Sequence, residues 1–104
     1  MSKPKLLTQD VDFAKTLPRW SVSADLKVLS QEFIFADFKG AFEFMTLVAH
    51  YAEEIDHHPD WSNSWNRVNV HLSTHSMGGL TELDILLAGG MDQFADRVLN
   101  SPQA

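Results

Sequence analysis

The sequence predicts an α+β domain in which an antiparallel sheet carries its helices on one face. The pattern of segments reads helix, two strands, helix, strands, helix, and it lacks the alternating strand and helix period of a parallel sheet. The chain has 104 residues and is 44% apolar, which is enough for one sizeable core. We therefore expect a single domain over residues 1–104.

The first third of the chain predicts a short helix and then two strands. Thr8 is a suitable N-cap, and the helix has to end before Pro18 because proline cannot continue it. The runs RWSVS and KVLSQEFIF are rich in β-branched and aromatic residues, and residues 24–25 between them fit a tight turn. Phe33 and Phe35 would lie on one face of the second strand.

Asp37 predicts the N-cap of a long helix. Eight apolar residues follow it at three-and-four spacing and are expected to form the buried stripe: Phe38, Ala41, Phe42, Met45, Val48, Ala49, Ala52 and Ile55. Lys39, Glu43, Thr46 and His50 would line the exposed side. Pro59 disfavours helical geometry in the residue before it, so the pair His57 and His58 is expected at the helix end.

The second half of the chain predicts a strand, a loop and a final helix. In NRVNVHLST, Val68, Val70 and Leu72 alternate with polar residues, as in a strand with one buried face. SMGG predicts the loop, and Thr81 with Asp84 resembles a capping box. The helix has apolar positions at Leu83, Leu86, Leu87, Phe94 and Val98, and Gly89 with Gly90 indicates a kink or a close packing contact.

Composition excludes several classes of function. The chain has eight basic and fourteen acidic residues and a net charge of −6, so we expect no direct nucleic-acid partner, because phosphate binding depends on lysine and arginine. No segment has the length and hydropathy of a membrane span, and the first residues lack a signal-peptide pattern. With no cysteine, disulfides and thiolate chemistry are absent. We expect a cytoplasmic protein.

Four of the five histidines lie within DHHPDWSNSWNRVNVHLSTH, residues 56–75. His71 falls on the exposed side of the predicted strand, so we expect it to be a solvated residue. The remaining three, His57, His58 and His75, admit four interpretations: surface residues, a metal site, a nucleophilic triad, or acid–base chemistry.

The metal and triad interpretations have little support. Glu54 and His57 have the E-x-x-H spacing of di-iron bundles, but a second such motif is missing, and adjacent side chains such as those of His57 and His58 point in different directions. A triad using Ser73, Thr74 or His75 would lack the G-x-S-x-G elbow. We therefore expect no bound metal.

Acid–base chemistry suits a histidine cluster, because imidazole titrates near neutrality. Glu53 lies four residues before His57 and would orient it from the same helix face, while Asp84 could hold an imidazole from across the site. Either carboxylate could instead be a solvated charge or a helix cap. Trp61 and Trp65 offer flat walls for a planar ligand, or they are core anchors.

The spacing of these residues resembles the signature of the pterin-4a-carbinolamine dehydratase family. Three residues separate Glu53 from the run His57, His58 and Pro59; five residues then intervene before Trp65, nine before His75 and eight before Asp84. The resemblance extends through Trp20, DFKGAFEFMTLVA and LSTH, over about residues 8–100. It departs at Leu83, where the family often has a basic residue.

This resemblance implies a four-stranded antiparallel sheet and a dehydration reaction. Family members remove water from a 4a-hydroxytetrahydropterin, which aromatic amino-acid hydroxylases produce, to give the quinonoid dihydropterin without a cofactor. Two segments are implied to bind the pterin, one with Asp56, His57 and His58 and the other with Ser73, Thr74 and His75. Within them we expect His57, oriented by Glu53, to protonate the leaving hydroxyl, and His58 or His75 to handle the N5 proton.

The resemblance also implies assembly into a homodimer or homotetramer. The long helix has further apolar positions at Phe44, Leu47 and Tyr51 that could serve such an interface. Some animal members act as a dimerisation cofactor of a homeodomain transcription factor. An alternative function is therefore a protein-binding module that acts in this way or regulates an aromatic amino-acid hydroxylase.

Overall fold

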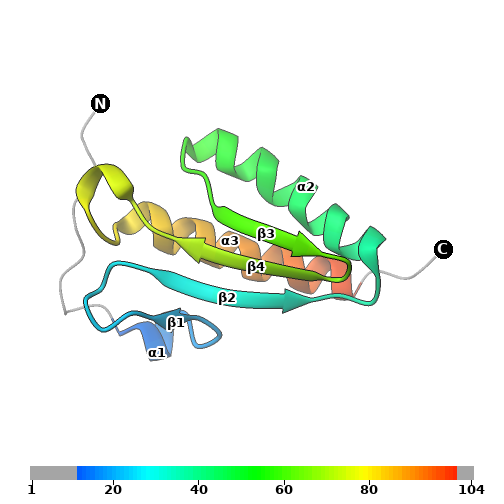
Figure 1. The fold of residues 1–104 in the computed structure, drawn as a ribbon, viewed down its shortest axis with the longest axis horizontal. Coiled ribbons are helices and arrows are strands. Elements are labelled where there is room, and N and C mark those ends of the chain that lie inside the picture. The colour runs from blue at the N-terminus through cyan, green and yellow to red at the C-terminus, as the bar shows by residue number, and fades with distance from the viewer. Residues whose placement is uncertain (1–11, 101–104) are drawn as a thin grey trace.

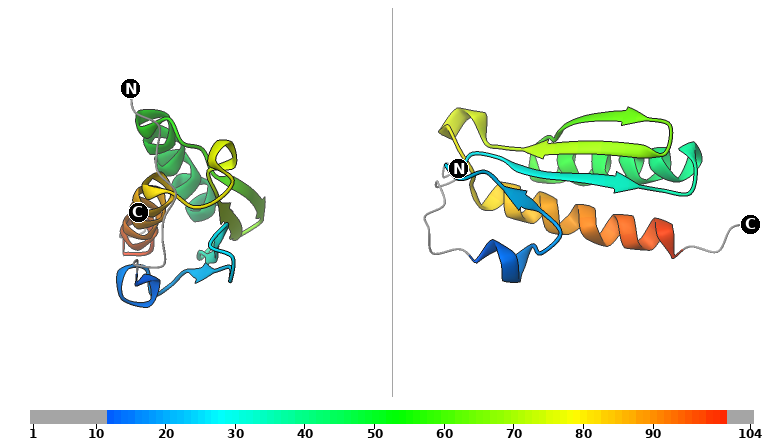
Figure 2. Two further views of the ribbon diagram at one scale, coloured as in Figure 1. Left: turned by 90° about the vertical axis from the view of Figure 1, so that its left-hand side faces the viewer. Right: turned by 60° about the horizontal axis from the view of Figure 1, so that its bottom comes forward.

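Four strands form one antiparallel sheet in the order β1–β2–β4–β3 in the computed structural model, which describes residues 12–100. The strands are β1 (Ser21–Val22), β2 (Leu29–Ile34), β3 (Asp60–Ser64) and β4 (Arg67–Leu72). Two long helices, α2 (Phe38–Ile55) and α3 (Glu82–Leu99), pack side by side on one face of this sheet (Figures 1 and 2). The α+β prediction and the four-stranded sheet are confirmed.

The short helix α1 (Phe13–Thr16) precedes the sheet and is capped by Asp12, whose carboxylate accepts a hydrogen bond from the Lys15 N–H at 3.2 Å. The expected cap, Thr8, lies outside the described residues. The hairpin of β1 and β2 follows as predicted, with Val22 paired to Leu29.

Aromatic side chains fill the core under the central strands. Phe33 and Phe35 lie on one face, as predicted, and both contact the ring of Phe44, with centroids 4.7 and 5.0 Å away. Trp20 meets Phe33 edge to face at 5.8 Å. Pairs of this geometry add to the free energy that burial itself contributes.

The buried stripe of α2 differs in part from the prediction. Asp37 caps the helix as expected, accepting from the Gly40 N–H at 2.8 Å. The buried residues are Ala41, Phe44, Val48 and Ala52, while Met45 and Ile55 are half-buried. Phe38 and Phe42 are exposed, as is Ala49, so their predicted burial is wrong. The four polar residues expected on the wet side are exposed.

Strand β4 has the predicted alternation, with Val68, Val70 and Leu72 buried against the helices. Strand β3 is an edge strand that runs alongside β4 from the pair Asp60–His71 to the pair Ser64–Arg67. Four of its five residues are exposed. It therefore has no alternating apolar signal by which the sequence could have indicated it.

The loop after β4 contains a short 3-10 helix, η1 (His75–Met77), followed by Gly78 at φ 73°. Helix α3 then begins at Thr81 with the predicted capping box. Gly90 confirms the expected close contact, because a Cβ there would lie 2.6 Å from the Tyr51 ring.

The buried face of α3 differs from the prediction. Leu87 is buried as expected, but Leu86 is exposed, and Leu83, Phe94 and Val98 are only half-buried. Within the described residues, neither long helix has a stretch apolar enough to cross a membrane.

Polar side chains tie the segment between α1 and β1 to α3. Asp96 accepts two hydrogen bonds from the guanidinium of Arg19, at 2.9 and 3.1 Å. Asp92, one helical turn earlier, accepts from Trp20 Nε1 and from the Gln31 amide, both at 3.1 Å. Burial raises the pKa of Asp92, whereas the hydrogen bond from Arg19 lowers the pKa of Asp96.

Candidate functional site

The two histidine segments meet at one end of the β3–β4 hairpin. His58 and Pro59 lead directly into β3, whose first residue, Asp60, pairs with His71 on β4. The second segment, residues 73–75, follows the last residue of β4. The antiparallel register therefore brings together segments that are about 16 residues apart in the sequence.

His57 forms a buried pair with Asp84. Its Nε2 lies 2.6 Å from Asp84 Oδ1, and the two side chains are 10% and 0% exposed. The pair joins the chain just after α2 to the first turn of α3. The His57 backbone N–H donates to the Ala52 carbonyl at 3.0 Å, which holds the His57 backbone against the last turn of α2.

His58 forms the second pair, with Glu53, and the expected pairing of Glu53 with His57 is wrong. His58 Nε2 lies 2.5 Å from Glu53 Oε2, and the side chains are 56% and 76% exposed. The reason is the geometry of Asp56, which caps α2 in the left-handed region at φ 51° and ψ 46°. The chain leaves the helix there, so helical spacing no longer relates Glu53 to His57.

The second predicted segment divides between a buried and an exposed part. Thr74 is 5% exposed and its hydroxyl donates to Asp84 Oδ2 at 2.8 Å, while Ser73 is half-buried. His75 is exposed at the start of η1, and its ring has no hydrogen-bond partner within residues 12–100. The Thr74 N–H is also occupied, since it donates to the Gly79 carbonyl at 3.0 Å.

Trp61 and Trp65, the two tryptophans expected as walls for a planar ligand, occupy different places. Trp61 is half-buried against the core, near the histidine end of β3. Trp65 is 63% exposed in the two-residue turn that joins Ser64 to Arg67. The five residues of β3 lie between Trp65 and the histidine end of the strand, and they span roughly 17 Å at the usual rise. Trp65 therefore cannot act as a wall beside these histidines within one chain.

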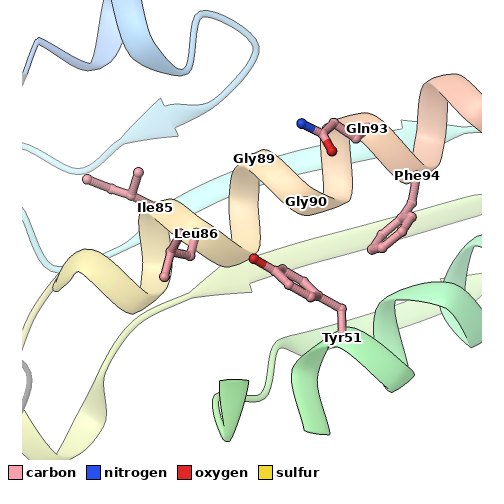
Figure 3. Close-up of a pocket in the computed structure, with 7 residues that line it drawn as sticks. All are labelled: Tyr51, Ile85, Leu86, Gly89, Gly90, Gln93 and Phe94. Carbon is pink, nitrogen blue, oxygen red and sulfur yellow. The ribbon is translucent and has the colours of Figure 1, made fainter. Parts of the chain in front are cut away.

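A groove on the outer surface is lined by none of the residues of the two histidine–carboxylate pairs. It opens between α2 and α3 with a volume of about 290 Å³, and Figure 3 shows the seven residues around it. They are Tyr51, Ile85, Leu86, Gly89, Gly90, Gln93 and Phe94. The Tyr51 and Phe94 rings meet edge to face, with centroids 5.9 Å apart.

The described part of the chain brings no three histidine, aspartate or glutamate side chains close enough to hold a metal ion. Sequence reasoning identified Thr81 only as a helix cap. In the structure its hydroxyl is fully buried and lies 2.7 Å from Thr74 Oγ1, so it belongs to the polar network of the site. The capping-box spacing to Asp84 was the available signal.

An antiparallel sheet backed by two long helices, with two histidine–carboxylate pairs where the second helix meets the hairpin, defines the class: a small α+β protein with an imidazole–carboxylate site. The chain belongs to the pterin 4 alpha carbinolamine dehydratase family, whose model matches residues 4–94. The resemblance inferred from the motif is confirmed.

Curated relatives from bacteria carry this dehydratase name, provisionally assigned. A protein of Rhizorhabdus wittichii is 46% identical over 85 residues, which cover 82% of this chain and 88% of the relative. One of Bordetella avium is 46% identical over 92 residues, covering 88% and 85%.

Solved structures share the fold. A Brucella melitensis protein described as a transcriptional coactivator/pterin dehydratase matches with a TM-score of 0.79 and 41% identity, covering 88% of this chain and 99% of that one. A pterin dehydratase-like protein, described as a RuBisCO assembly factor in the alpha-carboxysome, matches with a TM-score of 0.64 over 77% and 93%. At 22% identity this second structure supports the fold alone.

Proposed function

We propose that this protein is a 4a-hydroxytetrahydropterin dehydratase that works by histidine acid–base catalysis. The observation that carries the proposal is the buried pair of His57 and Asp84, next to the exposed pair of His58 and Glu53. Family membership names the reaction class. The geometry offers two imidazoles in different environments, which suits a reaction that needs one proton donor and one proton acceptor.

The dehydration moves two protons and breaks one bond. His57, as an imidazolium, gives a proton to the C4a hydroxyl; the C4a–O bond breaks and its electron pair leaves with water. The N5 lone pair forms the C4a–N5 double bond, and the N5 proton passes to His58 or His75. The carboxylate of Asp84, and not Glu53 as expected from the sequence, orients His57 in this proposal, and it also compensates the positive charge of the imidazolium.

The substrate site consists of the two segments around these histidines. One segment contributes Asp56, His57 and His58, and the other contributes Ser73, Thr74 and His75. Because the Thr74 side chain and N–H already have partners, we assign its contribution to positioning and leave ring contacts to Ser73 and the histidines. The reaction would serve tetrahydropterin recycling after an aromatic amino-acid hydroxylase, in the cytoplasm, with residues 1–104 acting as one domain.

The direct test follows the decay of 4a-hydroxytetrahydropterin, generated in place by a hydroxylase, with and without the purified protein. We expect acceleration above the spontaneous rate, and the same acceleration after extensive chelation, because the mechanism requires only protons. No acceleration would contradict the proposed activity. A loss on chelation that one added metal ion restores would contradict the acid–base mechanism.

We also propose that the outer surface of α2 and α3 mediates self-association into a dimer or tetramer. On α2, Phe38 and Phe42 are 47% and 56% exposed and their rings contact each other at a tilt of 35°, with centroids 5.7 Å apart; the groove around Tyr51 and Phe94 lies between α2 and α3. Exposed aromatic clusters of this kind mark interfaces. Phe44, which the sequence offered as an interface position, is fully buried in the core and cannot contribute to this surface.

Light scattering at micromolar concentration tests self-association, with Phe42→Glu as the disrupting variant and Glu43→Gln, at the exposed neighbouring position of α2, as the matched control. We expect an oligomer that Phe42→Glu dissociates and Glu43→Gln preserves. A monomeric wild type would contradict the proposal. The coactivator description of the Brucella melitensis relative supports the alternative role as a protein-binding module. For that role we propose the same surface as the place of contact.

A further inference from the structure

The hydroxyls of Thr74 and Thr81 form a chain of hydrogen bonds that ends on the carboxylate of Asp84. The two oxygens lie 2.7 Å apart, and Thr74 Oγ1 lies 2.8 Å from Asp84 Oδ2. All three side chains are buried, with 5%, 0% and 0% exposure. Buried hydroxyls need partners, and here each finds one inside the network.

The direction of every proton in this chain follows from counting donors. A carboxylate only accepts, so Thr74 gives its single hydroxyl proton to Asp84. Thr74 then has only a lone pair to offer Thr81, whose hydroxyl must donate to it. Thr81 in turn accepts from the Leu83 N–H at 3.3 Å. The hydrogen bonds therefore all point one way, from the Leu83 N–H through Thr81 and Thr74 to the Asp84 carboxylate.

Counting donors and acceptors in the same way also determines which ring nitrogen of His57 carries a proton. Asp84 Oδ2 receives Thr74 and the Thr81 N–H at 2.9 Å, which leaves Oδ1 for His57 Nε2. A lone pair on Nε2 would face the carboxylate and repel it, so Nε2 carries a proton. Within residues 12–100 Nδ1 has no hydrogen-bond partner, and no buried side-chain nitrogen or oxygen there lacks one, so Nδ1 is not sealed in the core.

The loop between the two threonines holds them in contact. Thr74 and Gly79 form an isolated antiparallel bridge, with the Thr74 N–H bonded to the Gly79 carbonyl at 3.0 Å. Thr74 also occupies the N-cap position of η1 without making a side-chain cap. A threonine at such a position usually caps with its hydroxyl. Here that hydroxyl is committed to the chain instead.

We infer that Thr74 and Thr81 are positioning residues that hold His57 in its Nε2–H form through Asp84, so that Nδ1 is the atom that exchanges protons with the substrate. The inference rests on the proposed function for its kinetic consequence. Its structural consequence, the tautomer of His57, can be measured without substrate.

Nuclear magnetic resonance of ¹⁵N-histidine-labelled protein reads the tautomer of His57 through long-range proton–nitrogen couplings. In the wild type we expect neutral His57 to be protonated at Nε2. Thr74→Val, which removes one hydroxyl and keeps the shape, is expected to give a mixture of tautomers and to lower kcat by about tenfold with little change in KM. Thr74→Ser should restore both. Wild-type His57 protonated at Nδ1 would overturn the inference, whatever the activity.

Thr81→Val tests the first member of the chain but also removes a helix cap. Asp37→Ala is the matched control, because it removes the cap of α2 and touches no member of the chain. We expect Thr81→Val, but not Asp37→Ala, to alter the His57 signals. Unchanged tautomer and unchanged kcat in both threonine variants would refute the positioning role while leaving the dehydratase proposal intact. A wild type with the expected tautomer but no activity would refute the dehydratase proposal alone.

Discussion

The two histidine–carboxylate pairs of this site are sequence neighbours with opposite environments. The pair of His57 and Asp84 is nearly sealed from solvent, whereas His58 and Glu53 are mostly exposed. The buried carboxylate also accepts from Thr74 and from the Thr81 N–H, while no other hydrogen bond to the Glu53 carboxylate is present within residues 12–100. The adjacent residues His57 and His58 thus differ in environment: the fold fixes the His57 ring, whereas the His58 ring is open to solvent.

This difference has an energetic side. An exposed ion pair typically contributes about 0–1 kcal/mol, because solvent and salt screen it and because long side chains lose entropy. A buried donor that loses its acceptor costs about 1–3 kcal/mol. The pair with Asp84 should therefore control both the stability and the chemistry of the site, and the pair with Glu53 should matter little to stability.

The largest expected effect is on turnover. Replacing a general acid typically costs about 10²- to 10⁴-fold in rate. We expect His57→Ala to lower kcat by at least about tenfold after the spontaneous rate is subtracted, with KM little changed. His58→Ala and His75→Ala should cost less, because water can take the N5 proton at an exposed position. Steady-state kinetics of the three variants make the comparison.

Ser73→Ala is the matched control for these kinetics. A ring contact that is equally strong in ground and transition states affects KM, so this variant should raise KM and leave kcat near that of the wild type. If His57→Ala retains nearly full kcat while His58→Ala or His75→Ala abolishes it, the assignment of the acid to His57 is wrong. The site would then work from its exposed pair.

The next effect is on stability. Asp84→Ala leaves three buried donors without an acceptor, on His57, Thr74 and the Thr81 backbone, and should lower the free energy of unfolding by at least about 3 kcal/mol. Glu53→Ala should change it by about 1 kcal/mol or less. Urea denaturation followed by circular dichroism measures both. Equal losses in the two variants would mean that burial does not distinguish the pairs.

Local patterns in the sequence predicted the caps of the two long helices and the inner strand well, whereas α1 is capped by Asp12 and not by the expected Thr8. Asp37, Thr81 and Asp84 act within one helical turn, and the alternation at Val68 and Val70 reports a single strand, so neither needs tertiary information. Strand β3 was not predictable in this way. Its place is set by hydrogen bonds to β4, and its side chains face solvent.

The helix face and the carboxylate partners depended on the whole fold. Helix α2 is apolar on several sides, so Phe42 and Phe44 both fit a three-and-four pattern, and only contact with Phe33 and Phe35 selects Phe44. Asp84 was one of the two carboxylates that the sequence offered for the histidines, but His57 was assigned to Glu53 for a related reason. The pairing of Glu53 with His57 assumed helical spacing between them, and the left-handed turn at Asp56 ends that spacing before His57.

A contrast between a more buried and a more exposed carboxylate recurs on α3, one helical turn apart. Asp92 is partly buried against Trp20 and Gln31, and Asp96 bonds Arg19 at the surface. Burial raises the pKa of Asp92, while its hydrogen bonds oppose this rise. The hydrogen bond from Arg19 lowers the pKa of Asp96. The two groups should therefore couple to pH with opposite signs.

The smallest expected effect is this pH dependence, read from melting temperatures between pH 3 and pH 7. Asp96, whose folded-state pKa is lowered, adds stability above its unfolded value of about 3.9 and loses it as pH falls, so Asp96→Asn should be most destabilising near neutrality and approach the wild type in acid. For Asp92 the folded-state pKa is raised, and ionisation reduces stability as pH rises. The melting temperature of Asp92→Asn, relative to that of the wild type, should therefore increase as pH rises. High salt should weaken only the Asp96 effect, since that pair is exposed. Parallel pH profiles for the two variants would show that burial and pairing do not separate these carboxylates.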